Sequence, residues 1–403
     1  MLIVFRIADD PQQAGLLTTA AAGIFILPFF VFSAFAGNLA DSFEKTALIR
    51  QIKLAEIVIM LFGGWALLSE NLWALFVLLF LMGAQSAFFG PLKYAILPEH
   101  LAEHELTQGN AWLSGSTFLA ILLGTLLGGW VILTENGVLF MAGLVIFMAF
   151  LGYFASLKIP VSHLRPEPIK PPFKLFKLTH QEVSAARNHA QAFLAVMAIS
   201  WFWFLGAAYL SQIPVLVKAL GGDESVVLAF LVTFTVGIAL GAFLVNRWVP
   251  KFSALSALRY HGVLLASLSV FIALSSGLMA TISLPEPASL QTASVFFSDW
   301  IAVLIWLTFL AIPVLGGIYI VPLYTHLQTH SPEYFRGRMI AVNNIINALL
   351  MVLSSLFFLL CYGLGLDLIT IFYVIAGLNV LVAMALHRHW QCLARLPIVE
   401  VEV

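Results

Sequence analysis

Long apolar runs divide the sequence, and they limit the folds that the chain can adopt. A helix needs about 20 mostly apolar residues to cross the hydrocarbon core of a bilayer. Runs of this kind occur eleven times, near residues 14–36, 50–69, 71–90, 111–133, 138–158, 190–219, 225–247, 258–279, 300–326, 338–361 and 367–386. Lipid leaves backbone polar groups without water, and a helix satisfies them within one segment. The sequence therefore predicts an all-α polytopic membrane protein with eleven transmembrane helices.

Composition agrees with this class and excludes others. Hydrophobic residues make up 61% of the 403 residues and charged residues only 10%, whereas soluble domains carry about a quarter charged residues. The net charge of −1 gives no electrostatic basis for binding nucleic acid. Two cysteines, Cys361 and Cys392, indicate neither a disulfide framework nor a thiol metal site. No cluster of acids, histidines or nucleophiles falls at mid-membrane depth, so we expect no enzyme activity, no metal and no cofactor.

The basic residues predict which side each loop faces. Loops rich in Lys and Arg stay in the cytoplasm. With eleven alternating spans, all of the 19 basic residues except Arg6 and Lys218 fall on one side. This predicts a cytoplasmic C-terminus and places Met1 outside. A directly exported N-terminus is one interpretation. We favour a further span upstream, with "LIVF" as its outer end and "RIADDPQQ" as its external turn.

The predicted cytoplasmic loop at 159–189 divides the chain into halves. Residues 1–158 form a first half that lacks one span, residues 190–390 a six-helix second half, and residues 391–403 a tail. The loop begins Pro-rich and becomes basic and apolar ("FKLFKLTHQEVSAARNH"). This second part is either an amphipathic helix on the anionic inner leaflet or a positively charged linker. An internal match between 90–113 and 321–345 indicates that the halves are repeats, as in parallel-repeat transporters.

Two segments near the predicted cytoplasmic side indicate gating or coupling. In "GNLADSFEK" (37–45), Gly37 permits close helix approach, and Asp41 either caps a helix or pairs with a basic group on a gating helix. Glu56 is an acid within a span, which favours a coupling role. Glu56 also lies three residues after Lys53, so a simple ion pair is the alternative.

Small and polar residues within the spans indicate packing positions and a cavity. Gly115, Gly124, Gly128 and Gly129 have the spacing that lets membrane helices pack closely. Polar groups amid an aromatic-rich wall suit an amphipathic substrate better than a sugar or an ion. Lys93 is either a ligand for a phosphate or an inner-leaflet anchor. The candidate substrate-binding residues are Gln85, Ser86, Lys93, Tyr94, Asn110, Tyr209, Gln212, Asn343, Asn344 and Asn347.

Several stretches resemble the bacterial lysophospholipid transporter family of the major facilitator superfamily. These are "DPQQAGLLTTAAAGIFILPFF", "GNLADSFEK", "GAQSAFFGPLKYAILPEHL" and "FLAILLGTLLGGW", and "FFGPLKYAIL" is the most specific. "GNLADSFEK" also resembles the superfamily loop G-x-L-A-D-x-x-G-R-K/R, with Phe43-Glu44 in place of Gly-Arg. The glycine-rich span is similar to an antiporter motif but lacks its proline.

The resemblance implies a major facilitator fold of twelve helices in the bacterial inner membrane. It implies alternating-access transport of lysophospholipids, chiefly lysophosphatidylethanolamine, and an acyltransferase or acyl-carrier-protein synthetase as partner or fusion. The family's arginine on its seventh span has no counterpart around "GAAYLSQIPVL", and its acid on the eleventh is replaced near Asn347. An exporter of drugs or small amphiphiles and a non-transporting module that docks an acyltransferase are the alternatives.

Overall fold

The described part of the chain is helical and built to cross a membrane. The computed structural model describes residues 11–131, 134–161, 175–248 and 290–394. Ten helices in these ranges are long and apolar enough to span a bilayer. They correspond to ten of the eleven predicted spans. The remaining predicted span, at 258–279, lies outside the described residues. The protein is therefore an all-α, multi-pass membrane protein.

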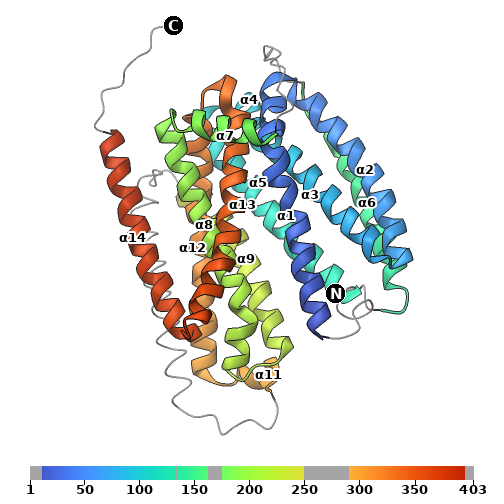
Figure 1. The fold of residues 1–403 in the computed structure, drawn as a ribbon, viewed down its shortest axis with the longest axis vertical. Coiled ribbons are helices and arrows are strands. Elements are labelled where there is room, and N and C mark those ends of the chain that lie inside the picture. The colour runs from blue at the N-terminus through green and yellow to red at the C-terminus, as the bar shows by residue number, and fades with distance from the viewer. Residues whose placement is uncertain (1–10, 132–133, 162–174, 249–289, 395–403) are drawn as a thin grey trace. The chain divides into compact units, whose positions relative to one another are not determined.

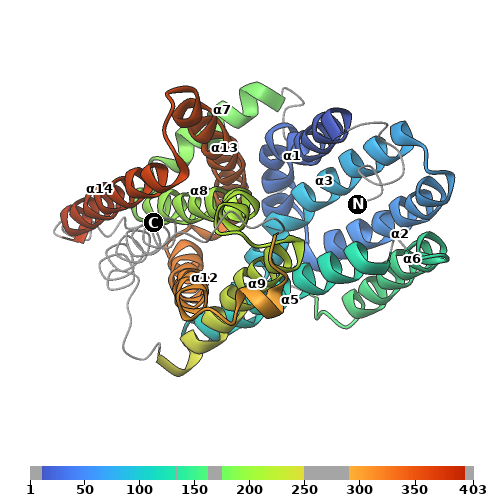
Figure 2. The same cartoon turned by 90° about the horizontal axis from the view of Figure 1, so that it is seen from below.

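The first of two compact units contains most of the N-terminal helices. It includes α1 (Pro11–Ser42), α2 (Lys45–Ser69), α3 (Leu72–Ala95), α4 (Leu97–His100), α6 (Gly137–Ser156) and α7 (Leu175–Ala186). It also contains Gln328–Ala348, which holds the 3₁₀ helix η4 (Glu333–Phe335) and the first turns of α13 (Arg336–Gly363). In the view of Figure 2, α1, α3, α2 and α6 follow one another, and adjacent helices in this order are in contact. Figure 1 shows α7 lying across the end of α1.

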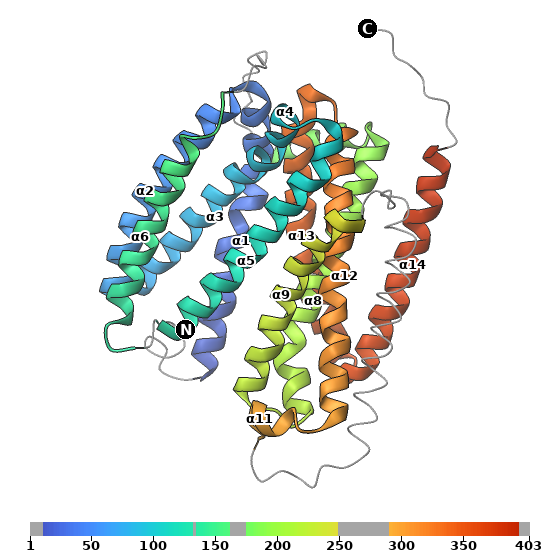
Figure 3. The ribbon, with the colours of Figure 1, turned by 180° about the vertical axis from the view of Figure 1, so that it is seen from behind.

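The second unit contains α9 (Glu224–Trp248), α11 (Ala293–Phe296), α14 (Leu368–Ala394), most of α8 (Ala190–Ala219) and α12 (Trp300–Thr329), and the rest of α13. It also includes Thr107–Leu122, most of α5 (Leu106–Val131). In Figure 3, α8, α9 and α12 lie side by side, and α11 covers one end of α9. A methyl group at Gly241 would overlap the carbonyl oxygen of Val314, so small residues set the crossing of α9 and α12.

Capping residues explain where two of the early helices begin. The Glu44 carboxylate accepts hydrogen bonds from the backbone N–H groups of Thr46 (2.8 Å) and Ala47 (2.6 Å), which fixes the start of α2. The Asn71 side chain accepts from Ala74 N–H and does the same for α3. Glu44 thus occupies the capping position at α2, and Asp41 has other partners.

The two stretches that match within the sequence also share local structure. After α3 and α4, the short 3₁₀ helix η2 (Glu103–Glu105) leads into α5. After α12, η4 leads into α13 in the same manner. Each 3₁₀ helix begins on a glutamate. The predicted domain boundaries at 158 and 190 remain a prediction, since the compact units combine segments from both sides of them.

Candidate functional site

The residues of "GNLADSFEK" do not form the loop that their polarity suggests. Helix α1 continues to Ser42, and α2 begins at Lys45. Gly37 and Asp41 therefore lie one turn apart on the same face of α1. Asp41 is 7% exposed, and Asn38 between them is 3% exposed. Buried polar groups need partners, and these come from α13 and α7.

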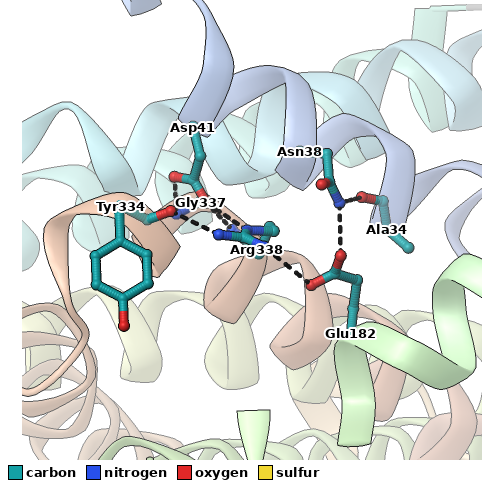
Figure 4. Close-up of polar contacts among 7 residues, drawn as sticks. All are labelled: Ala34, Asn38, Asp41, Glu182, Tyr334, Gly337 and Arg338. Atoms are coloured by element: carbon teal, nitrogen blue, oxygen red, sulfur yellow. Dashed lines mark hydrogen bonds and ion pairs between the residues drawn. The ribbon is translucent and has the colours of Figure 1, made fainter. Parts of the chain in front are cut away.

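Asp41 binds the first turn of α13. Its Oδ1 accepts the backbone N–H of Gly337 at 2.6 Å, and its Oδ2 accepts the backbone N–H of Arg338 at 2.9 Å (Figure 4). The first N–H groups of a helix have no partner within the helix, and the helix dipole makes this end positive. A carboxylate from α1 therefore satisfies and neutralises the start of α13.

Two glycines allow this contact, because each helix backbone lies against the other. A methyl group at Gly37 would lie 2.6 Å from the Ala341 Cβ and 2.9 Å from the Arg338 Cα. A methyl group at Gly337 would lie 2.7 Å from Asp41 Oδ1 and 2.9 Å from the Ala40 Cβ. Neither position has room for a larger residue.

The Arg338 side chain ties the contact together. Its Nε lies 3.4 Å from Asp41 Oδ2, its Nη1 lies 3.9 Å from Glu182 Oε2, and its Nη2 donates to the carbonyl of Tyr334 at 2.9 Å (Figure 4). The guanidinium also lies 4.4 Å from the centre of the Phe335 ring. We call Asp41, Gly337 and Arg338 the α1–α13 lock.

A second polar cluster joins α2 to α3. Glu56 Oε2 accepts from Lys53 Nζ at 2.8 Å and from Gln85 Nε2 at 2.6 Å. Ser86 Oγ lies 3.4 Å from Gln85 Oε1. The ion pair that the spacing of Lys53 and Glu56 indicates is therefore formed, and Gln85 adds a partner from the next helix. A coupling role for Glu56 remains a proposal.

Lys93 lies on α3 two turns beyond Gln85. It is half-buried, and its Nζ lies 5.0 Å from the centre of the Tyr94 ring. Within the described ranges, no acid lies within ion-pair distance of it, whereas Lys53 has Glu56 as its counter-ion. The backbone carbonyl of Tyr94 accepts from Gln328 Nε2 at 2.9 Å.

The predicted cavity residues are divided between the two units. Gln85, Ser86, Lys93, Tyr94, Asn343, Asn344 and Asn347 lie in the first unit, and Asn110, Tyr209 and Gln212 in the second. Asn343 is fully buried, and neither atom of its amide has a hydrogen-bond partner among the described residues.

In the second unit the predicted residues mostly join helices. Asn110 donates to Thr325 Oγ1 at 3.3 Å, and Gln212 accepts from the Tyr362 hydroxyl at 2.7 Å. The Tyr209 ring lies 5.9 Å from that of Phe372.

The four glycines predicted for helix packing differ in their surroundings. A methyl group at Gly115 would lie 2.6 Å from the Phe243 ring, so this glycine meets a neighbouring helix. One at Gly124 would meet nothing within 4 Å, and one at Gly128 would meet only Met141 at 3.9 Å. The surroundings of Gly129 lie outside the described residues.

Sequence reasoning missed four residues that the structure joins to the predicted ones. Arg338 enters the sequence analysis only as one of the basic residues that predict the topology, and Gly337, Glu182 and Asn38 are not singled out there. Glu182 had one signal: it lies four residues from Leu178 and from Ala186, on the apolar face of the amphipathic segment. Lys45 and Glu99 form a further buried ion pair that was not expected.

Comparisons with known proteins assign the family. The Major Facilitator Superfamily model matches residues 4–355. The chain is 26% identical over 328 residues to the lysophospholipid transporter LplT of Klebsiella pneumoniae, covering 80% of this chain and 74% of the relative. Identity to the LplT proteins of Cronobacter sakazakii and Yersinia pestis is also 26%, over 335 and 330 residues, with 80% of this chain and 74% and 72% of the relatives covered.

Solved structures show the same fold at low sequence identity. The human organic anion transporter MFSD10 gives a TM-score of 0.67 at 14% identity, covering 93% of this chain and 84% of the other. An outward-facing bacterial homologue of the iron transporter ferroportin gives 0.66 at 14% identity, covering 98% and 93%. With this fold and the family match over residues 4–355, the chain belongs to the Major Facilitator Superfamily and is a multi-pass membrane transporter.

Proposed function

We propose that the protein moves lysophospholipids, with lysophosphatidylethanolamine as the main example, across the bacterial inner membrane by alternating access. The α1–α13 lock carries the mechanism. It joins a helix from the first half of the sequence to one from the second half through a charged contact. Such a contact is either made or broken, which suits a two-state gate. The curated relatives named lysophospholipid transporters support the substrate class.

In this proposal the lock closes the cytoplasmic side. The distribution of basic residues predicts that the start of α13 and the end of α1 lie on the cytoplasmic side. While the lock is formed, the substrate cannot leave to the cytoplasmic side. Its release frees the first turn of α13, and the lipid leaves inward. Gly37 and Asp41 are gating residues here.

Lys93 and the polar residues near it provide a place for the head group. A lysophospholipid carries a phosphate, and Lys93 is a half-buried cation without an acidic partner among the described residues. Gln85 and Ser86 lie two turns away on the same helix, and Asn343, Asn344 and Asn347 belong to α13. The acyl chain would lie against the aromatic wall. Tyr94 is a further proposed contact in this unit, and the substrate contacts proposed for Asn110, Tyr209 and Gln212 belong to the second unit.

Glu56 is the proposed coupling group. It holds Lys53 and Gln85 together, and protonation of its carboxylate would weaken both contacts at once. Proton entry would thus loosen α2 from α3 beside the proposed head-group position.

Uptake by proteoliposomes tests the proposal. The purified protein is reconstituted, and uptake of labelled lysophosphatidylethanolamine is compared among the unmodified protein, Asp41→Asn and the exposed control Gln181→Ala. Asn is close in shape to Asp but has one acceptor oxygen and no charge, so we expect uptake to fall at least about tenfold. The control should retain it. Absence of uptake by correctly inserted, unmodified protein would refute the lipid assignment. Full uptake by Asp41→Asn would refute the gate.

A further inference from the structure

Helix α7 is the part of the predicted linker that the transport proposal leaves without a role. Leu178, Glu182 and Ala186 are 3%, 6% and 0% exposed and follow one another at four-residue intervals. Lys177 and Gln181 are exposed on the other face. The segment is therefore an amphipathic helix, one of the two interpretations of the sequence, and protein covers its apolar face. Leu178 packs in one cluster with Ala34 of α1 and Ile345 of α13.

A carboxylate lies in the middle of this buried face. Burial of an unpaired charge is costly, so a buried acid is retained where other groups compensate it. Asn38 Nδ2 donates to Glu182 Oε1 at 2.9 Å and also to the Ala34 carbonyl at 2.9 Å. Arg338 Nη1 lies 3.9 Å from Glu182 Oε2 (Figure 4). Glu182 thus contacts both α1 and α13.

Glu182 is one of three groups around the Arg338 guanidinium, and its Oε2 forms an ion pair there without a hydrogen bond. The three nitrogens of the guanidinium each have a different oxygen within reach: Asp41 for Nε, Glu182 for Nη1 and the Tyr334 carbonyl for Nη2. Removal of one of these oxygens leaves the side chain with two contacts and weakens the restraint on its rotation. A planar guanidinium transmits such a change because its nitrogens move together.

The linker is closely connected to a transmembrane helix. Only Arg187, Asn188 and His189 separate α7 from α8. This turn is ordered by hydrogen bonds from Asn188 N–H to the Ala185 carbonyl and from His189 N–H to the Ala186 carbonyl. A displacement of α8 during transport would therefore act on α7 across a short, structured turn.

We infer that α7 is a latch on the α1–α13 lock and that Glu182 is its positioning residue. Glu182 holds Arg338 against Asp41 while α7 bridges α1 and α13, and α7 releases α13 when the lock opens. This inference rests on the proposed gating function, but it does not depend on the identity of the substrate.

Thiol labelling tests the latch without substrate. Ser42 is 3% exposed and lies one turn beyond Asn38 on α1, so Ser42→Cys reports opening at this end of the helix. The background carries Cys361→Ala and Cys392→Ser. We compare maleimide labelling rates for Glu182→Ala, Glu182→Gln and the exposed neighbour Gln181→Ala.

Each variant has a distinct expected rate. Glu182→Ala loses both contacts, and labelling should rise about tenfold, which corresponds to loss of one hydrogen bond to a charged group. Glu182→Gln keeps an acceptor for Asn38 and loses the charge near Arg338, so its rate should be intermediate. Gln181→Ala should label as the parent does. Glu182→Gln is nearly isosteric, so it remains informative if Glu182→Ala does not fold.

A second measurement separates positioning from general support of the fold. If Glu182 acts through Arg338 on Asp41, Glu182→Ala should add less than about twofold to the labelling rate in an Asp41→Asn background. If Glu182 has a merely structural role, Glu182→Ala should raise the labelling rate by the same factor in the Asp41→Asn background as in the parent. Full additivity, or a Glu182→Ala rate within twofold of the parent, would overturn the latch. If labelling follows the expected pattern but lipid uptake is absent, the substrate proposal fails and the latch stands.

Discussion

Gly37→Ala is the substitution that most directly tests whether close approach of α1 and α13 is required. A methyl group at this position would lie 2.6 Å from the Ala341 Cβ, whereas ordinary contacts begin at 3.4 Å. It would also lie 2.9 Å from the Arg338 Cα, which is backbone and cannot rotate away. The two helices must therefore separate locally by about 0.8 Å, because close-packed interiors have few voids to absorb the methyl group.

Separation of this size weakens the lock. The hydrogen bonds from Gly337 and Arg338 to Asp41 measure 2.6 and 2.9 Å. They would lengthen to about 3.4 and 3.7 Å, beyond the usual range for N–H···O bonds. Hydrogen bonds to a charged group contribute about 1.5–3 kcal/mol each. Water that binds the separated groups offsets part of this loss. We take a net loss of about 2 kcal/mol, which shifts the equilibrium between closed and open lock roughly 30-fold toward open.

Two assays and a matched control check this value. Alanine favours a helix over glycine by about 1 kcal/mol whether the lock is open or closed, so overall stability should hold. Labelling of the Ser42→Cys reporter should rise roughly 30-fold, and lysophosphatidylethanolamine uptake should fall at least about tenfold. Gly124→Ala, where a methyl group meets nothing within 4 Å, should behave as the parent. Equal labelling and uptake in the two alanine variants would refute the reasoning.

Three further changes test the remaining parts. Lys93→Gln should raise the lysophosphatidylethanolamine concentration for half-maximal uptake about tenfold, because loss of a phosphate contact weakens binding, whereas Lys93→Arg should not. Equal half-maximal concentrations in the two variants would favour a membrane anchor. Glu56→Gln should abolish uptake driven by a pH gradient but leave exchange of labelled for unlabelled lipid, and retained gradient-driven uptake would contradict coupling. Burial and the nearby Arg338 charge lower the pKa of His189, so the unfolded chain binds more protons and stability should fall as pH drops below about 6.5. In His189→Gln the unfolding temperature should fall less between about pH 7.5 and 5.5 than in the parent. An equal fall in both would contradict the role of His189 in this pH dependence.

Much of the fold could be predicted from the sequence, because the bilayer imposes a length and a polarity on each helix. The span predicted at 190–219 has the bounds of α8, and ten predicted spans have helices in the described residues. The prediction was less accurate at the end of α1. Polar residues from Asn38 to Ser42 indicated a loop, but the helix continues through them. The partners of Asn38 on α7 and of Asp41 on α13 make the burial of these two residues possible.

The candidate site was only partly predictable, because the residues that contact one another lie far apart in the sequence. An acid after a glycine turn indicated a contact with a gating helix, but nothing local could indicate which residue it would meet. Asp41 and Arg338 are nearly 300 positions apart, and Asn38 and Glu182 about 140. Two of Asp41's acceptor contacts are to backbone N–H groups, which no side-chain pattern encodes. Glu56 could be identified because an ionised group within a span is rare, and Lys93 because it is a cation just beyond the end of a predicted span.

A reversible cross-link across the lock tests the central claim most directly. Ala34 and Ile345 lie in one buried cluster, on α1 and α13 respectively. In a background with Cys361→Ala and Cys392→Ser, the pair Ala34→Cys and Ile345→Cys is oxidised to a disulfide, and uptake of labelled lysophosphatidylethanolamine is measured before and after reduction. If α1 and α13 must separate in each cycle, the oxidised protein should not transport and reduction should restore uptake. Uptake by the fully cross-linked protein at the rate of the reduced one would contradict the account.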